Sequence, residues 1–131
     1  MACILLVDDS KFQRTANMRI LAKAGYKVSV AGDGEEALAS VAHERPDLIV
    51  LDLLLPKMNG VDVIKELRQN AQTATIPVVV LSSLSEKNGA KLLREGASAY
   101  FEKSRLEGKT YGDELLKITG KLLSEVTTVS V

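Results

Sequence analysis

The sequence has no excess of basic residues, no second cysteine and no long apolar segment, and each absence excludes a class of protein. Lysine plus arginine and aspartate plus glutamate each number 17, so the chain lacks the basic surplus that attracts nucleic acid. The single cysteine, Cys3, excludes a disulfide within one chain. No signal peptide follows Met1, and no apolar run is long enough for a transmembrane helix. These features predict a cytoplasmic domain without direct membrane or nucleic-acid binding.

The sequence does contain a regular alternation of apolar runs and helical periodicity. Its 131 residues, 46% of them hydrophobic, suffice for one domain with a substantial core. Apolar runs predict strands at 4–7, 27–31, 48–53, 77–81 and 99–102. Apolar residues at helical spacing predict a helix after each strand, and the fourth helix, at about 86–95, has the weakest pattern.

Local capping signals predict where several of these helices begin. Ser10 with Gln13 forms a capping box before a helix in which Phe12, Ala16 and Ile20 recur at a spacing of four, with Leu21 and Ala24 beside them. Asp33 and Asn59 are predicted to cap the second and third helices, and Thr110 with Asp113 the last one.

Five β-then-α units imply an α/β fold with a parallel sheet covered by helices on both faces. Because crossovers are right-handed, few topologies remain. One is the doubly wound, flavodoxin-like order 2-1-3-4-5, whose ligand site lies beyond the carboxyl ends of the strands. The half-polar strand 27–31, with Ser29, then falls at an edge, and the continuous apolar strands lie in the centre.

This order brings distant polar residues to one edge of the sheet. Asp8 and Asp9 follow the first strand, and Asp52 ends the third. Adjacent carboxylates repel each other in a low-dielectric site, so a neighbouring cation is expected. Oxygen ligands without histidine or cysteine suit a hard divalent ion such as Mg²⁺. We therefore expect Asp9 to bind Mg²⁺ directly, with Asp8 helping directly or through water.

Two further polar residues predict what else binds there. Ser82 ends the fourth strand and Lys103 follows the fifth. A hydroxyl and an ammonium group are suited to hold phosphoryl oxygens. Asp52 between a metal and these groups could attack phosphorus as a nucleophile. Taken singly, Asp8, Asp9, Ser82 and Lys103 also have structural explanations as caps, loop residues or solvated charges.

Several stretches together resemble the receiver domain of two-component response regulators. They are "ILLVDDS", "AGDGEEAL", "RPDLIVLDLLLPKMNGVDVIKELR", "IPVVVLSS" and "EGASAYFEK". The resemblance covers residues 3 to about 124, so we expect a receiver domain at 1–124. Residues 125–131 would be a frayed tail or a truncated linker.

The resemblance implies a role for each residue of the site. Asp52 would be the phosphoacceptor, and Asp8, Asp9, Asp52 and the backbone carbonyl of Leu53 would bind Mg²⁺ or Mn²⁺. Ser82 and Tyr100 would be the switch residues, and Lys103 would match the invariant lysine of the family. The phosphoryl group would come from a sensor histidine kinase, a phosphotransfer protein or a small donor such as acetyl phosphate. Such a chain is not an enzyme beyond catalysing its own phosphorylation and dephosphorylation.

The resemblance also implies an output surface and leaves partners open. Phosphorylation would reshape the face of helix four, strand five and helix five, which a downstream protein or output domain would read. A homodimer through that face is one assembly to test, although no residue pattern specifies it. Ser104 stands where the family has a proline joined through a cis peptide, and a trans Lys103–Ser104 bond is expected here.

Three other functions compete with this interpretation. A haloacid-dehalogenase-like phosphatase needs a second acid two residues after its nucleophile, where "DDSKF" has Lys11. A flavin- or dinucleotide-binding domain needs a glycine-rich phosphate loop after the first strand, where two aspartates would repel a phosphate. The third is a degenerate receiver that binds partners without being phosphorylated, which only a phosphorylation assay can distinguish.

Overall fold

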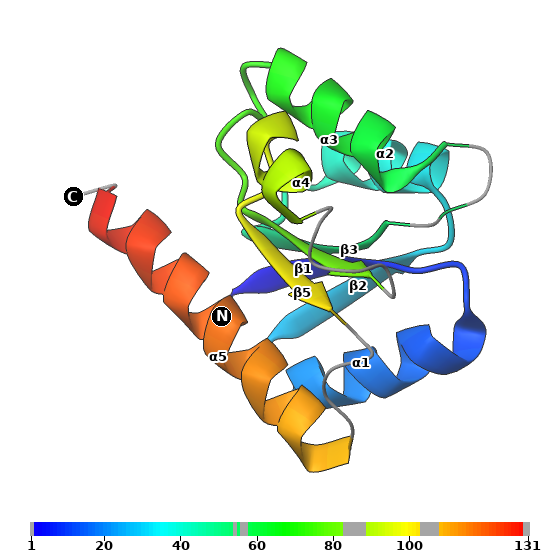
Figure 1. Ribbon diagram of the computed structural model, residues 1–131, viewed down its shortest axis with the longest axis vertical. Coiled ribbons are helices and arrows are strands. Elements are labelled where there is room, and N and C mark those ends of the chain that lie inside the picture. Colours follow the sequence, from blue (N-terminus) through cyan, green and yellow to red (C-terminus); the bar gives the residue numbers. More distant parts are fainter. Residues whose placement is uncertain (1, 54, 56–57, 83–88, 103–107, 130–131) are drawn as a thin grey trace.

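The protein folds into one parallel sheet with helices on both faces (Figure 1). A computed structural model describes residues 2–53, 55, 58–82, 89–102 and 108–129. Strands and helices alternate along these residues in the order β1 Cys3–Val7, α1 Lys11–Lys23, β2 Lys27–Ala31, α2 Gly34–His43, β3 Leu48–Asp52, α3 Gly60–Gln69, β4 Val78–Ser82, α4 Gly89–Glu95, β5 Ala99–Glu102 and α5 Gly108–Val129.

The strand order is β2-β1-β3-β4-β5, and every pair is parallel, which confirms the predicted doubly wound topology. Helices α2, α3 and α4 cover one face of the sheet, whereas α1 and α5 cover the other (Figure 1). The edge strand β2 is largely exposed, as its half-polar sequence predicts.

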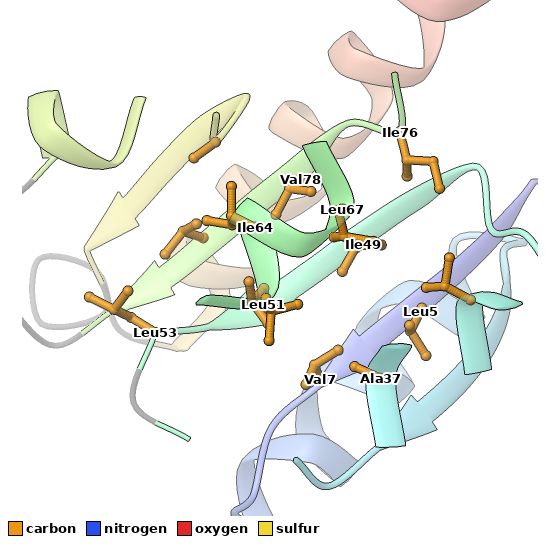
Figure 2. Packing of buried hydrophobic residues seen from close by; sticks show 14 of the residues in the cluster. Leu5, Val7, Ala37, Ile49, Leu51, Leu53, Ile64, Leu67, Ile76 and Val78 are labelled. Atoms are coloured by element: carbon orange, nitrogen blue, oxygen red, sulfur yellow. The ribbon is translucent and has the colours of Figure 1, made fainter. Parts of the chain in front are cut away.

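Alternating strand residues build two separate cores. Leu5, Val7, Ile49 and Leu51 belong to the core under α2 and α3, where Val7 lies beside Ala37 of α2 (Figure 2). The intervening strand residues belong to the core under α1 and α5 and include Ile4, Leu6, Leu48, Val50 and Phe101. Successive side chains of a strand point to opposite faces, so both faces of the three central strands are apolar.

The N-caps predicted at Ser10, Asp33 and Asn59 are confirmed, but the reciprocal half of the capping box at Ser10 is not, because the amide of Ser10 donates to Oδ1 of Asp8. Ser10 Oγ accepts from the amide of Gln13, Asp33 Oδ1 from that of Glu36, and Asn59 Oδ1 from that of Asp62. Each bond satisfies an amide that the first helical turn leaves unpaired. The cap predicted at Thr110 is wrong, because α5 already begins at Gly108. Tyr111 packs edge-on against Phe101 of β5 and anchors this earlier first turn.

The apolar face predicted for α1 is also partly wrong. Phe12 is 82% exposed and Ala16 is exposed, whereas the predicted Leu21 is buried, as is Asn17, and the predicted Ile20 packs against the core under α1 and α5. At 3.6 residues per turn, Phe12 lies on the side of α1 opposite to the buried Leu21. The periodicity was therefore correct for a helix, but the sheet contacts a different side of it.

Candidate functional site

The carboxyl ends of β1 and β3 place two aspartates side by side. The register of these strands pairs Val7 with Leu51, and Asp8 and Asp52 are the next residues along each chain. Leu6 and Val50, two positions before Asp8 and Asp52, belong to the core under α1 and α5. Because every second residue of a strand lies on the same face, Asp8 and Asp52 lie on that face of the sheet as well. The sequence-predicted convergence of the first and third strands is therefore present in the fold.

Asp9 joins this pair to form an acidic cluster of three carboxylates. One oxygen from each of Asp8, Asp9 and Asp52 lies within 4.8 Å of the other two. Asp8 is buried, Asp52 is partly buried and Asp9 is exposed, so the cluster opens to solvent on one side. Three like charges at such distances repel one another strongly when they are partly desolvated.

The acidic cluster fits the cation that the sequence predicts. Its donors are all carboxylate oxygens, the ligand type that Mg²⁺ and Mn²⁺ prefer. Their spacing allows one small ion to contact more than one of them. A divalent ion there would offset the repulsion, and water could complete its coordination from the exposed side at Asp9.

Three hydrogen bonds fix Asp8 to its surroundings. Its amide donates to the carbonyl of Ala31 at 3.1 Å, which extends the pairing of β1 with β2. Its Oδ1 accepts from the amide of Ser10 at 2.9 Å, and its carbonyl oxygen accepts from Nη1 of Arg14 at 3.2 Å. The last two bonds tie Asp8 to the start of α1, so the carboxylate and the helix are positioned together.

The backbone after Asp52 is held equally closely. The amide of Leu53 donates to the carbonyl of Leu81 at 3.0 Å, and the carbonyl of Leu53 accepts from the amide of Gly60 at 2.9 Å. A carbonyl oxygen has two lone pairs, so the Leu53 oxygen could still accept a metal. A Cβ atom on Gly60 would lie only 2.9–3.1 Å from backbone atoms of Asp52 and Leu53. Glycine is thus required for α3 to begin this close to the acidic cluster.

The remaining predicted residues are placed only in part. Ser82 is the last residue of β4 and is in register with Glu102 of β5, beside the end of β3. Tyr100 lies on β5, half-buried against the core under α2 and α3. Lys103 and the Lys103–Ser104 peptide lie outside the described residues. Their predicted roles stay predictions.

Two residues near the acidic cluster were not predicted as part of the site. Asn17 of α1 is buried, and Tyr111 of α5 lies beside it on the face where Asp8 and Asp52 emerge. The pKa of Tyr111 is raised to about 12, mainly by burial and to a smaller extent by the charges of Asp8 and Asp52, while Asn17 acts in the opposite direction. The tyrosine hydroxyl is therefore within electrostatic reach of the carboxylates. The only sequence signal for Asn17 was its position four residues before Leu21, which puts this polar residue on the same face of the helix as an apolar one.

Comparison with known proteins places this fold and acidic cluster in a family. The sequence profile of the response regulator receiver domain matches residues 4–109. The chain belongs to this family, whose members act in two-component phosphorelay signalling and interact with histidine kinases and output domains. This family assignment excludes the flavin- or dinucleotide-binding and the haloacid-dehalogenase-like interpretations.

Curated relatives and solved structures agree with this assignment. The chain is 44% identical over 101 residues to the alkaline phosphatase synthesis transcriptional regulatory protein PhoP of Bacillus subtilis, a match covering 76% of this chain and 41% of that protein. It is 40% identical over 103 residues to the response regulator MprA of Mycobacterium leprae, covering 76% of this chain and 43% of that protein. The chain thus spans less than half the length of these relatives.

Among solved structures, the receiver domain of the Francisella response regulator 1452 superposes with a TM-score of 0.86 at 29% identity, covering 96% of this chain and 99% of that one. The chemotaxis response regulator CheY4 of Vibrio cholerae gives a TM-score of 0.83 at 32% identity, covering 93% and 98%. Within the described residues, no helix has both the length and the apolar character needed to cross a membrane.

Proposed function

We propose that the chain is a phosphorylation-controlled switch in which Asp52 accepts a phosphoryl group in a reaction that requires Mg²⁺ or Mn²⁺. The observation that carries this proposal is the acidic cluster, which brings Asp8 and Asp9 of one strand end within 4.8 Å of Asp52 on the next. A carboxylate beside a cation-binding pair, at the open edge of a receiver fold, is suited to attack phosphorus.

The chemistry is an in-line displacement. A carboxylate oxygen of Asp52 forms a bond to phosphorus while the bond from phosphorus to the donor's histidine nitrogen or acetyl oxygen breaks. A bound divalent ion supplies charge neutralisation for the attacking and phosphoryl oxygens. Asp9 and Asp8 would hold that ion, with the Leu53 carbonyl as a further ligand. Ser82 and Lys103 would hold the phosphoryl oxygens.

The proposed output rests on β5 and its neighbouring helices. Ser82 ends β4, and Tyr100 lies half-buried on the adjacent strand β5. Engagement of Ser82 by the phosphoryl group would favour inward movement of Tyr100 and alter the face formed by α4, β5 and α5. Light scattering with and without beryllofluoride tests whether this face forms a homodimer, and an unchanged monomer mass would exclude that assembly.

We propose that the physiological donor is a sensor histidine kinase or phosphotransfer protein in the cytoplasm, and that the reader is a downstream protein or an output domain. The balanced charge, 17 acidic and 17 basic residues, supports indirect rather than direct action on nucleic acid. Binding of this chain to random duplex DNA at physiological salt would contradict that part of the proposal. Recovery of the native protein in the membrane or periplasmic fraction would contradict the cytoplasmic location.

The decisive experiment is incubation with acetyl phosphate and Mg²⁺, followed by intact-protein mass spectrometry and a phosphate-affinity gel. We expect the wild type to gain one phosphoryl group, and neither Asp52→Asn nor wild type with a chelator to gain it. Asp62→Asn is the matched control, since Asp62 is an exposed aspartate in the first turn of α3. The alternative, a degenerate receiver that binds partners without phosphorylation, predicts no modification of any variant, including with a panel of histidine kinases.

A further inference from the structure

Two buried polar atoms lie where α1 meets α5, and the proposed function does not use either. Asn17 is 1% exposed, and its Nδ2 has no hydrogen-bond partner among the residues that the structure describes. The hydroxyl of Tyr111 is buried and likewise has no partner there. Burying such a group without a hydrogen bond is unfavourable, so this arrangement needs an explanation.

The two atoms are complementary and adjacent. The amide nitrogen of Asn17 is a donor, and the phenolic oxygen of Tyr111 can accept. Asn17 acts on the Tyr111 hydroxyl as a hydrogen-bonding neighbour and lowers its pKa. However, the two groups do not meet the distance and angle of a formed hydrogen bond. A small relative movement of α1 and α5 would therefore pair both atoms.

Packing contacts hold Tyr111 against β5 and bring α5 close to α1. The Tyr111 ring stands edge-on to Phe101, with the ring centroids 5.2 Å apart and the ring planes at 90°. One residue along α5, a Cβ atom on Gly112 would lie 3.6 Å from the side chain of Ile20 of α1. The two helices are thus close together, and the ring is held from one side by β5.

Helix α1 is also tied to the acidic cluster. Asp8 is bonded to Ser10 and to Arg14, which lies in the first turn of α1. Any movement of the Asp8 backbone will thus carry the start of this 13-residue helix, which includes Asn17. With a cation bound, the repulsion among the three carboxylates falls and the cluster can contract.

We propose that Asn17 and Tyr111 are positioning residues whose side chains hydrogen-bond, Nδ2 of Asn17 to Oη of Tyr111, when the acidic cluster binds its divalent cation. Cation binding then tightens the contact between α1 and α5, and the pair in return raises the affinity for the cation. This inference rests on the proposed function, because it requires that the cluster binds a divalent cation.

The test is Mg²⁺ binding by calorimetry to the whole chain and to Tyr111→Phe, Asn17→Leu and the double variant. A net hydrogen bond of about 1 kcal/mol corresponds to about a fivefold change in affinity. We expect each single variant to bind Mg²⁺ about fivefold more weakly than the wild type, and the double variant to be no weaker than either. The matched control is Tyr26→Phe, which removes a tyrosine hydroxyl at the periphery of the same core and should leave the affinity unchanged.

Two further readouts separate this role from simple structural support. Without Mg²⁺, Tyr111→Phe should unfold in urea no earlier than the wild type, because the proposal pairs this hydroxyl with Asn17 only when the cation is bound. The side-chain amide signals of Asn17, identified by their absence in Asn17→Leu, should shift on adding Mg²⁺ to the wild type but not to Tyr111→Phe.

The inference is overturned if the Tyr111→Phe affinity stays within about twofold of the wild type, or if the two single losses multiply to about 25-fold in the double variant. It is equally overturned if Tyr111→Phe unfolds earlier without Mg²⁺. Failure of the proposed function has a different signature, since the wild type would then gain no phosphoryl group from acetyl phosphate, and a wild type that also bound no Mg²⁺ would reject both proposals.

Discussion

Replacing Gly60 by alanine should damage both the stability and the chemistry of the protein. The added Cβ would lie 2.9 Å from the Cα of Leu53, 3.0 Å from its carbonyl oxygen and 3.1 Å from that of Asp52. All three neighbours are backbone atoms, so no flexible side chain can yield. Overpacking of this kind costs about 1–3 kcal/mol, and it should displace the segment that carries Asp52, the proposed phosphoacceptor.

The assay is urea unfolding followed by far-ultraviolet circular dichroism. With a slope of about 2 kcal/mol per molar urea, a loss of about 2 kcal/mol lowers the midpoint by about 1 M. Phosphorylation by acetyl phosphate, measured under conditions where the variant is folded, should slow about tenfold or more because Asp52 is misplaced.

Gly112→Ala is the control, since it is also a helical glycine-to-alanine change. The three atoms nearest to its Cβ would all belong to the Ile20 side chain, at 3.6–3.8 Å, which is ordinary van der Waals contact. Alanine in a helix interior should stabilise the protein by about 0.5–1 kcal/mol relative to glycine. The reasoning would be refuted if Gly60→Ala were as stable as the wild type, or if both variants shifted the midpoint in the same direction.

Two further predictions concern Arg68 and Tyr111. The Arg68 guanidinium donates to the carbonyls of Gly96, Ala74 and Ile76 at 3.0, 3.1 and 2.7 Å, and burial lowers its pKa. Arg68→Met should therefore lower the free energy of unfolding by about 2–4 kcal/mol. The control Arg45→Met loses exposed hydrogen bonds to Gln72 and Thr75 and should change this free energy by less than about 1 kcal/mol. Equal effects of the two variants on urea unfolding would contradict the prediction. The pKa of Tyr111 is raised from 10.0 to about 12 in the fold, so the stability linked to its neutral form is complete below pH 10 and is lost as the pH rises through 12. Between pH 10 and 12, the free energy of unfolding of the wild type should fall by about 2–3 kcal/mol more than that of Tyr111→Phe. Parallel profiles of this free energy against pH for the two proteins would show that the hydroxyl is not buried as described.

The convergence of Asp8 and Asp52 was predictable from the sequence because parallel strands place their carboxyl ends at one edge. Continuous apolar runs identified the central strands, and half-polar residues identified β2 as an edge. The caps at Ser10, Asp33 and Asn59 were also predictable, since each satisfies a local amide without help from distant residues.

Features that depend on tertiary packing were not predictable in the same way. Helical periodicity suggested an apolar face containing Phe12 and Ala16, but it could not show which side of α1 rests on the sheet. Helix α5 begins at Gly108, before the local capping signal at Thr110, and Tyr111 in its first turn makes a tertiary contact with Phe101. Neither the polar pair of Asn17 and Tyr111 nor its closeness to Asp8 follows from any local pattern.

The central claim is that Asp8, Asp9 and Asp52 share one divalent cation and leave Asp52 to accept phosphorus. A crystal structure of the protein with Mg²⁺ and beryllofluoride tests this most directly. The account predicts one octahedral ion with oxygens of Asp9 and Asp52 at about 2.0–2.1 Å, Asp8 bound directly or through water, and beryllium attached to Asp52. An ion elsewhere, or beryllofluoride on a different residue, would contradict it.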